Sequence, residues 1–162
     1  ADFAAAKRIG SDYEMRRVYT AALDRGRMTV PLMVSLLEGS RELDSDYETA
    51  TLLIDVVRRQ RIDGAVRTPF FDALATIGSA YEKARVLQAL LRRGQVAEET
   101  LVAAIDETLS IGSDHEASQV LMAAARSHTL TGAARDAYVR AADRLAAHEQ
   151  SQALAALART GR

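Results

Sequence analysis

Apolar side chains recur along this chain in adjacent pairs whose spacing matches one face of an α-helix. In four places two such pairs follow each other at positions i, i+1, i+4 and i+5, which predicts one buried stripe per amphipathic helix. These first stripes are Val18, Tyr19, Ala22, Leu23; Leu52, Leu53, Val56, Val57; Val86, Leu87, Leu90, Leu91; and Val120, Leu121, Ala124, Ala125. A second stripe lies in each interval between them. Its members are Leu36, Leu37, Leu43; Phe70, Phe71, Leu74, Ile77; Leu101, Ile105, Ile111; and Tyr138, Val139, Leu145.

A four-residue polar motif precedes each first stripe at a fixed interval. Ser-Asp-Tyr-Glu begins at Ser11 and Ser45, Ser-Ala-Tyr-Glu begins at Ser79, and Ser-Asp-His-Glu begins at Ser113. The offsets 45−11, 79−45 and 113−79 are each 34, and a degenerate fifth copy begins at Ala146, after 33 residues. A regular period of this length is typical of helical repeat proteins.

Each motif has the composition of a helix start. Serine as N-cap accepts a hydrogen bond from the N3 amide, and glutamate at N3 is expected to reach back to the serine amide, which together form a capping box. We expect this first helix to end near Gly26 or its counterparts in the later repeats, and the second helix to begin at an N-cap residue. The counterparts of Gly26 are Gln60, Gly94 and His128, and the expected second caps are Thr29, Asp63 and Thr131.

The pattern therefore predicts an all-α protein with about ten helices. We expect a single right-handed α-solenoid domain over residues 1–162, because two short helices cannot enclose a core without stacking on their neighbours. Its predicted parts are a lone second-type helix, four helix pairs and a lone first-type helix. They span residues 1–10, then 11–44, 45–78, 79–112 and 113–146, then 147–162.

Pro69 interrupts this pattern. It falls at about the sixth position of a helix that would start after Asp63, where proline lacks an amide and clashes with the preceding turn. Thr68-Pro69 is itself a good helix start. We therefore predict that the main helix begins at Thr68, and that the shortened element opens a notch beside Phe70 and Phe71. The alternative is that both rings fill the core.

The repeat resembles the HEAT-like α-solenoid arrays of bacteria. The resemblance is carried by the capping motif at Ser79, the apolar pair Val86-Leu87 and the run Leu90-Leu91-Arg92-Arg93-Gly94. Such arrays are attached to membrane-anchored regulatory proteins, including sensor-type metallopeptidases, so the resemblance implies an interaction or sensing module. The likeness to tetratricopeptide repeats is one of length alone.

Composition adds few constraints. The chain has 48% hydrophobic and 27% charged residues, a net charge of −1, and no cysteine. These values are typical of a soluble segment, but they leave open a periplasmic or a cytoplasmic location. The sequence begins in mid-pattern at Ala1, so we expect it to be a fragment of a larger bacterial protein.

No pattern of catalytic or metal-binding residues is evident, so we predict a protein that is not an enzyme and needs no cofactor. His115 and His148 stand in the tyrosine position of the motif, and His128 stands at a helix end. None has a second histidine four residues away. The repeated serines are helix caps and form no nucleophile elbow.

Three sets of residues are candidate binding elements for another protein or a peptide segment. The first is a ladder with one aromatic ring per repeat, made of Tyr13, Tyr47, Tyr81 and His115. We expect its rings to pack across the seam between repeats, and the alternative is an aromatic edge that binds an extended ligand. The second is an acidic series on the second helices, together with the two phenylalanines: Glu38, Asp72, Asp106, Phe70 and Phe71.

The third set consists of arginines at the ends of the first helices, which could contact anions such as phosphates. Its members are Arg58, Arg59, Arg61, Arg92 and Arg93. A net charge of −1 and the lack of stacking aromatics beside these arginines count against nucleic acid. The alternatives to a protein-binding module are a structural spacer, in which the charged faces serve solubility alone, and the less favoured nucleic-acid-binding helical-repeat protein.

Overall fold

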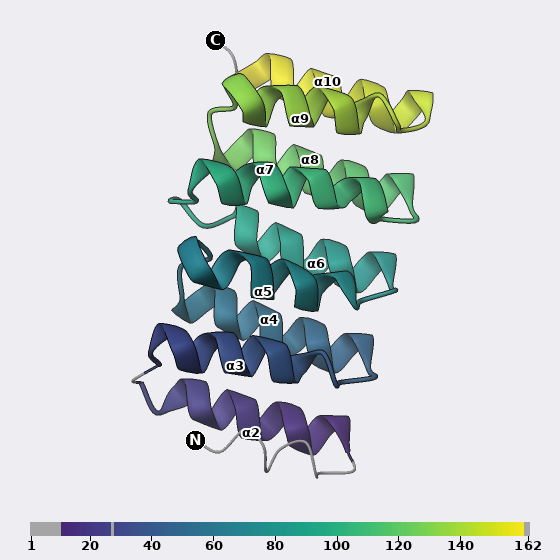
Figure 1. Cartoon of the computed structure of the whole chain (residues 1–162). Helices are drawn as coiled ribbons and strands as arrows, with labels where there is room; N and C mark the ends of the chain where they lie inside the picture. Colours follow the sequence, from purple (N-terminus) through teal and green to yellow (C-terminus); the bar gives the residue numbers. More distant parts are fainter. Residues whose placement is uncertain (1–10, 27, 161–162) are drawn as a thin grey trace. The chain divides into compact units, whose positions relative to one another are not determined.

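The computed structural model describes residues 11–26 and 28–160 of the chain. All regular elements in these residues are helical, and there are nine α-helices and one 3-10 helix (Figure 1). They are α2 (Asp12–Asp24), α3 (Val30–Ser40), α4 (Asp46–Arg59), α5 (Gly64–Ala75), α6 (Ala80–Leu91), α7 (Glu98–Glu107), η1 (Thr108–Ser110), α8 (Asp114–Ser127), α9 (Gly132–Ala142) and α10 (Ala147–Thr160). The all-α class is confirmed. The predicted helix over residues 1–10 lies outside the described residues.

The chain divides into two compact units, with the boundary in the sequence between Glu82 and Lys83. In the N-terminal unit, α2 packs on α4 and α3 packs on α5. In the C-terminal unit, α7 packs on α9 and α8 packs on α10. Helices that are two apart in the sequence are therefore neighbours in space within each unit.

The predicted apolar stripes form the cores of the two units. Leu52, Leu53 and Phe70 in the first unit and Leu121 and Tyr138 in the second are fully buried. Each such side chain contributes roughly 1.5 to 3 kcal/mol through removal of apolar surface from water. Val18 is an exception to the predicted stripe, because 38% of its side chain is exposed.

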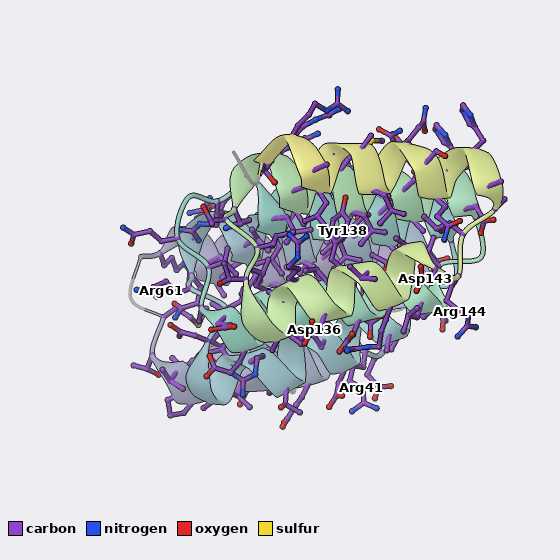
Figure 2. The ribbon with its side chains drawn as sticks, turned by 90° about the horizontal axis from the view of Figure 1, so that it is seen from above. Arg41, Arg61, Asp136, Tyr138, Asp143 and Arg144 are labelled. Carbon is purple, nitrogen blue, oxygen red and sulfur yellow. The ribbon has the colours of Figure 1, made fainter. Side chains whose placement is uncertain are left out.

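Tyr138 joins two helices of the C-terminal unit through its hydroxyl. The side chain comes from α9 (Figure 2). Its hydroxyl donates a hydrogen bond of 2.6 Å to the carbonyl of Ala153 in α10. Burial raises the pKa of this phenol well above its usual value. The tyrosine therefore supplies both apolar area and a satisfied polar contact in the core.

The serine caps are confirmed at three of the four motifs, but the expected role of the glutamate is wrong at Ser45 and Ser79, whose amides donate to aspartates. Ser45, Ser79 and Ser113 accept hydrogen bonds of 3.3, 3.2 and 3.2 Å from the amides three residues ahead. The amide of Ser45, however, donates to Asp12 rather than to its own glutamate. Ser11 makes no side-chain capping bond.

The aspartate of the motif links one motif to the next. The amide of Ser45 lies 2.5 Å from the Asp12 carboxylate, and the amide of Ser79 lies 2.8 Å from the Asp46 carboxylate. The third instance joins the Ala146 amide to Asp114 over 2.9 Å. Each aspartate is the first residue of its helix, so its carboxylate lies at the positive end of that helix. The same carboxylate accepts a hydrogen bond from the backbone amide that precedes the next helix of the same type.

The second helices α3, α5 and α9 begin at the predicted N-cap residues, but only one of these residues caps its helix with its side chain. Thr29 accepts a hydrogen bond of 3.4 Å from the Leu32 amide, whereas the N-cap residues Asp63 and Thr131 make no side-chain capping bond. The next residues, Gly64 and Gly132, have φ angles of +51° and +52°. This left-handed conformation is easily adopted by glycine, which turns the chain into the helix at these two positions.

The predicted break at Thr68-Pro69 is wrong. Helix α5 is continuous from Gly64 to Ala75 with Pro69 inside it. The amide that proline lacks would have bonded to the carbonyl of Ala65, an exposed residue near the helix start where water can take its place. Phe70 is fully buried in the core, and its ring meets the partly exposed ring of Phe71 edge to face at 5.4 Å.

A close contact between Tyr19 and Gly39 sets the packing of α2 against α3. A Cβ atom added at Gly39 would lie 2.4 Å from the Tyr19 hydroxyl and 3.1 Å from the ring carbon that bears it. Tyr19 is fully buried, and burial, followed by the charge of Glu42, raises its pKa. In the next repeat, 34 residues later, the equivalent positions hold Leu53 and Ala73. The tyrosine is thus replaced by a smaller residue and the facing glycine by a larger one.

Replacement of Asp46 by alanine tests the aspartate link. We expect Asp46→Ala to lower the free energy of unfolding by about 1 to 2 kcal/mol, because it removes a charge-assisted hydrogen bond and a favourable helix-end charge. Asp46→Asn, which keeps an acceptor, is expected to lose less. Denaturant titration measures both, with Asp136→Ala on the exposed surface of α9 as the control. Equal effects of Asp46→Ala and Asp136→Ala would contradict the proposed role of the link.

Replacement of Gly39 tests the compensating pair. Gly39→Ala alone is expected to destabilise by about 1 to 3 kcal/mol, because the overpacked tyrosine outweighs the gain of about 1 kcal/mol in helix propensity. The double variant Tyr19→Leu/Gly39→Ala restores the combination found at Leu53 and Ala73, and we expect it to recover at least half of that loss. Thermal and denaturant unfolding of the full double-mutant cycle provide the measurement. Additive effects of the two substitutions would show that the contact is unimportant.

Candidate functional site

Three tyrosines of the aromatic ladder form an exposed row in the N-terminal unit, which we call the tyrosine row. Tyr13, Tyr47 and Tyr81 are the second residues of α2, α4 and α6, and their side chains are 51%, 58% and 62% exposed. More than half of each side chain is exposed, so these rings are not buried in a seam between repeats. His115 takes the same position in α8 of the C-terminal unit and is also exposed.

Contacts beside the row hold its helices in register. The aspartate links from Asp12 and Asp46 join residues that flank the tyrosines. The Arg16 side chain also donates a hydrogen bond of 2.6 Å to the Glu48 carboxylate, and both side chains are mostly buried. The tyrosines are therefore carried on fixed helix ends rather than on a loop.

Tyr13 shows which chemistry suits these rings. The guanidinium carbons of Arg16 and Arg17 lie 5.4 and 5.7 Å from its ring centroid. These distances are within the range of a cation–π interaction. In the sequence, Ala50 and Thr51 occupy the corresponding positions beside Tyr47. Glu14 and Glu48, which follow Tyr13 and Tyr47, pair with Arg17 and Arg16, so it is the faces of the rings that favour a cationic group.

The acidic series on the second helices is only partly available. Glu38 and Asp72 are exposed on α3 and α5, which pack together in the N-terminal unit. Asp106, in the C-terminal unit, lies 3.6 Å from Arg140 of α9. Its charge is therefore partly balanced within the protein. Phe70 is buried and does not contribute to a surface.

The candidate anion contacts are largely matched by nearby acids. Arg58 lies 3.9 Å from Asp55, Arg61 lies 3.2 Å from Asp63, and Arg59 pairs with Asp24. Arg92 donates a hydrogen bond of 3.1 Å to Gln88, and Arg93 is partly buried. This pairing reduces the positive field that phosphate binding requires.

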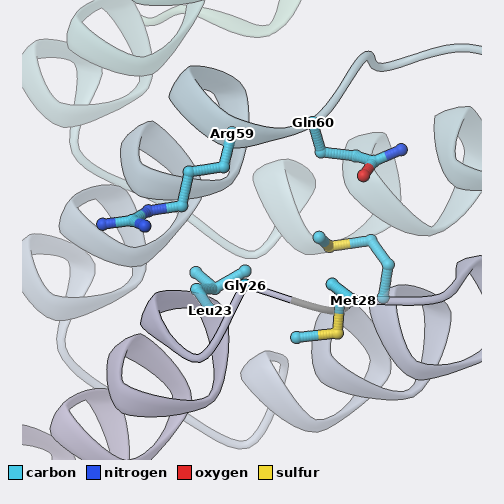
Figure 3. Close-up of a pocket in the computed structure, with 6 residues that line it drawn as sticks. Leu23, Gly26, Met28, Arg59 and Gln60 are labelled. Carbon is cyan, nitrogen blue, oxygen red and sulfur yellow. The ribbon is translucent and has the colours of Figure 1, made fainter.

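One small pocket lies at the ends of α2 and α4. It has a volume of about 270 Å³ and is lined by Leu23, Gly26, Met28, Met33, Arg59 and Gln60. Figure 3 shows the Arg59 and Gln60 side chains diverging across it. Ligand pockets have volumes of about 300 to 1,000 Å³, so this one is at the lower limit for a drug-sized molecule. In the C-terminal unit His128, which takes the position of Gln60 in its repeat, forms a hydrogen bond of 2.6 Å with the Leu91 carbonyl.

The sequence analysis missed a buried charged group. Lys83 is only 6% exposed, and its amine lies 3.0 Å from the Ser110 hydroxyl and 3.8 Å from the Glu107 carboxylate. The repeat contained the signal, because the corresponding residues are Met15, Thr49 and Ala117, all buried. The ion pair is a structural feature of the C-terminal unit, in which glutamate and serine satisfy the lysine.

The described part of the chain contains no group of three or more side chains suited to hold a metal ion. Among its helices, none has the length and apolar character needed to cross a lipid bilayer. Comparison with known proteins gives no further assignment, since the chain matches no protein-family model, no curated protein and no solved structure.

Proposed function

We propose that this chain is a non-enzymatic protein-binding module, built as a right-handed α-solenoid of 34-residue helix pairs and similar in kind to bacterial HEAT-like arrays. Its partner is an extended, basic segment of another protein, which lies along the tyrosine row.

The repeat stack is supported by the agreement between sequence period and contacts. The aspartate link recurs with the motif, from Asp12 to Ser45 and from Asp46 to Ser79. Helices of the same type pack on each other, α2 on α4, α3 on α5, α7 on α9 and α8 on α10. A stack of identical units is expected to produce both features, because each unit must bury its apolar face against its neighbours.

The observation that carries the binding function is the exposure of three tyrosines at equivalent positions. Each ring is more than half exposed, although a hydroxyphenyl ring gains free energy when its apolar surface is buried. Equivalent positions on neighbouring helices give roughly 10 Å between successive rings, the usual interhelix distance. An extended peptide covers that distance in about three residues.

The exposed faces of these rings favour arginine or lysine in the partner. Tyr13 already contacts two guanidinium groups of its own helix, and an incoming arginine could make the same contact with Tyr47 or Tyr81. The alternative, a spacer with no specific ligand, gives no reason for a repeated exposed aromatic ring.

Deletion of one repeat tests the stack. Removal of residues 79–112 is expected to leave a folded helical protein of lower stability, because the remaining units still meet through equivalent surfaces. Removal of residues 79–95 alone, half a unit, is expected to destroy cooperative unfolding. Circular dichroism during thermal unfolding distinguishes the two. An unfolded whole-unit deletion together with a cooperative half-unit deletion would exclude the solenoid.

Selection from a random peptide library displayed on phage tests the binding function. We expect the chain to enrich peptides that contain spaced arginine or lysine residues. Tyr47→Ser/Tyr81→Ser should weaken their binding on the order of tenfold, since each cation–π contact contributes about 0.5 to 2 kcal/mol. Leu109→Ser, which removes another exposed apolar side chain, serves as the matched control. The spacer alternative gains support if no peptide is enriched, or if the double variant binds the peptides as well as the original chain.

A further inference from the structure

One position in the repeat is buried in four helices and exposed in a fifth. Tyr19, Leu53, Leu87 and Leu121 are each 0% exposed, whereas Leu154 of α10 is 37% exposed. The register of α10 is fixed by the Ala146 amide, which bonds to Asp114 as the Ser45 amide bonds to Asp12. Leu154 therefore follows the first residue of its helix by seven positions, as Leu121 does in α8.

The neighbours of Leu154 show the same change. Ser118, Met122 and Ala125 of α8 are 0%, 7% and 1% exposed. Their counterparts in α10 are all exposed, and we call these residues together with Leu154 the α10 outer face. The α10 outer face consists of Ser151, Leu154, Ala155 and Ala158. It carries no charge, and its small residues would allow another helix to approach closely.

Helix α2 shows the opposite pattern. Val18 is 38% exposed, whereas Leu52, Val86, Val120 and Ala153 at the equivalent positions are each 0% exposed. Ala21 is likewise exposed in α2, whereas the equivalent Ala156 of α10 is 3% exposed. Val18 and Ala21 form the α2 outer face.

These opposite patterns give the repeat a direction. The side of a helix that carries Tyr19 or Leu121 is covered in α2 and α8 but not in α10, so it faces the following helix of the same type. The side that carries Val18 or Val120 is covered in α10 but not in α2, so it faces the preceding one. The α2 outer face and the α10 outer face therefore correspond to the two sides of the contact that α2 makes with α4 and that α8 makes with α10 within their units.

We propose that a second copy of this chain docks its α2 outer face on the α10 outer face, and so continues the repeat from one molecule to the next. The inference rests on the proposed repeat stack and does not use the tyrosine row. Because two different faces meet, the contact leaves one copy of each face open at the ends of every oligomer. Association is therefore expected to extend beyond a dimer as concentration rises.

The contact lacks one feature of the internal links. In α10 the position of Asp12, Asp46 and Asp114 is taken by Ala147, which has no carboxylate to accept from the Ser11 amide of a second copy. We therefore expect the natural association to be weak. Ala147→Asp should strengthen it on the order of tenfold, the effect of one added charge-assisted hydrogen bond.

Sedimentation of the chain over a wide concentration range, with two complementary variants, tests the proposal. Leu154→Glu blocks one face and Val18→Glu blocks the other, so each variant alone is expected to be monomeric. An equimolar mixture should form a one-to-one dimer that grows no further, because each molecule retains one of the two faces. Leu109→Glu and Val30→Glu, at exposed apolar positions outside both faces, should associate like the original chain.

Circular dichroism verifies that each variant is folded. Ala147→Asp provides a test in which the affinity between copies is expected to rise rather than fall. A chain that stays monomeric at every concentration would overturn the proposal, as would a plateau at the dimer or a mixture that remains monomeric. An unchanged affinity in Ala147→Asp would exclude the α2-on-α10 register. None of these outcomes depends on peptide binding by the tyrosine row.

Discussion

The hydrogen bond that a backbone amide at one helix start donates to an aspartate at another connects the local structure of each repeat to the stacking of the repeats. A helix begins with amides that have no partner inside the helix, and capping by its own side chains can satisfy only some of them. Here the motif serine accepts from one amide, while its own amide donates to the preceding repeat. One carboxylate thus satisfies an amide, stabilises a helix end and sets the spacing between two helices.

That spacing has consequences for the surface. Since the linked amides of Ser45 and Ser79 stand two residues before Tyr47 and Tyr81, the rings are carried where the helices begin. The rings are more than half exposed, and the buried apolar stripes together with the aspartate links hold the helices. Ala80 shows that the motif can change, because α6 has no carboxylate at this position. The links are therefore a property of particular junctions and not of every motif copy.

The repeat also tolerates exchange of volume inside the core. The pair Tyr19 and Gly39 fills the same positions as Leu53 and Ala73, so the added hydroxyphenyl volume is balanced by the loss of a methyl group on the facing helix. Lys83 replaces an apolar residue in another buried position and remains stable because Glu107 and Ser110 lie within reach. Such substitutions change one unit while the helix positions around it are kept.

The sequence by itself determined the all-α class, the helix starts at the serines and most of the buried stripes. The helix starts and the stripes depend on contacts between residues about four positions apart or fewer, and the sequence period repeats the same contacts in each unit. It did not determine the partner of the Ser45 amide, the continuity of α5 through Pro69 or the exposure of Tyr47. Each of these depends on what lies beside the helix in space. A capping box and an inter-repeat link use the same residue types, and a proline near a helix start is tolerated where water reaches the unpaired carbonyl. Only the packing of the helices decides between such alternatives, because the competing contacts have similar energies.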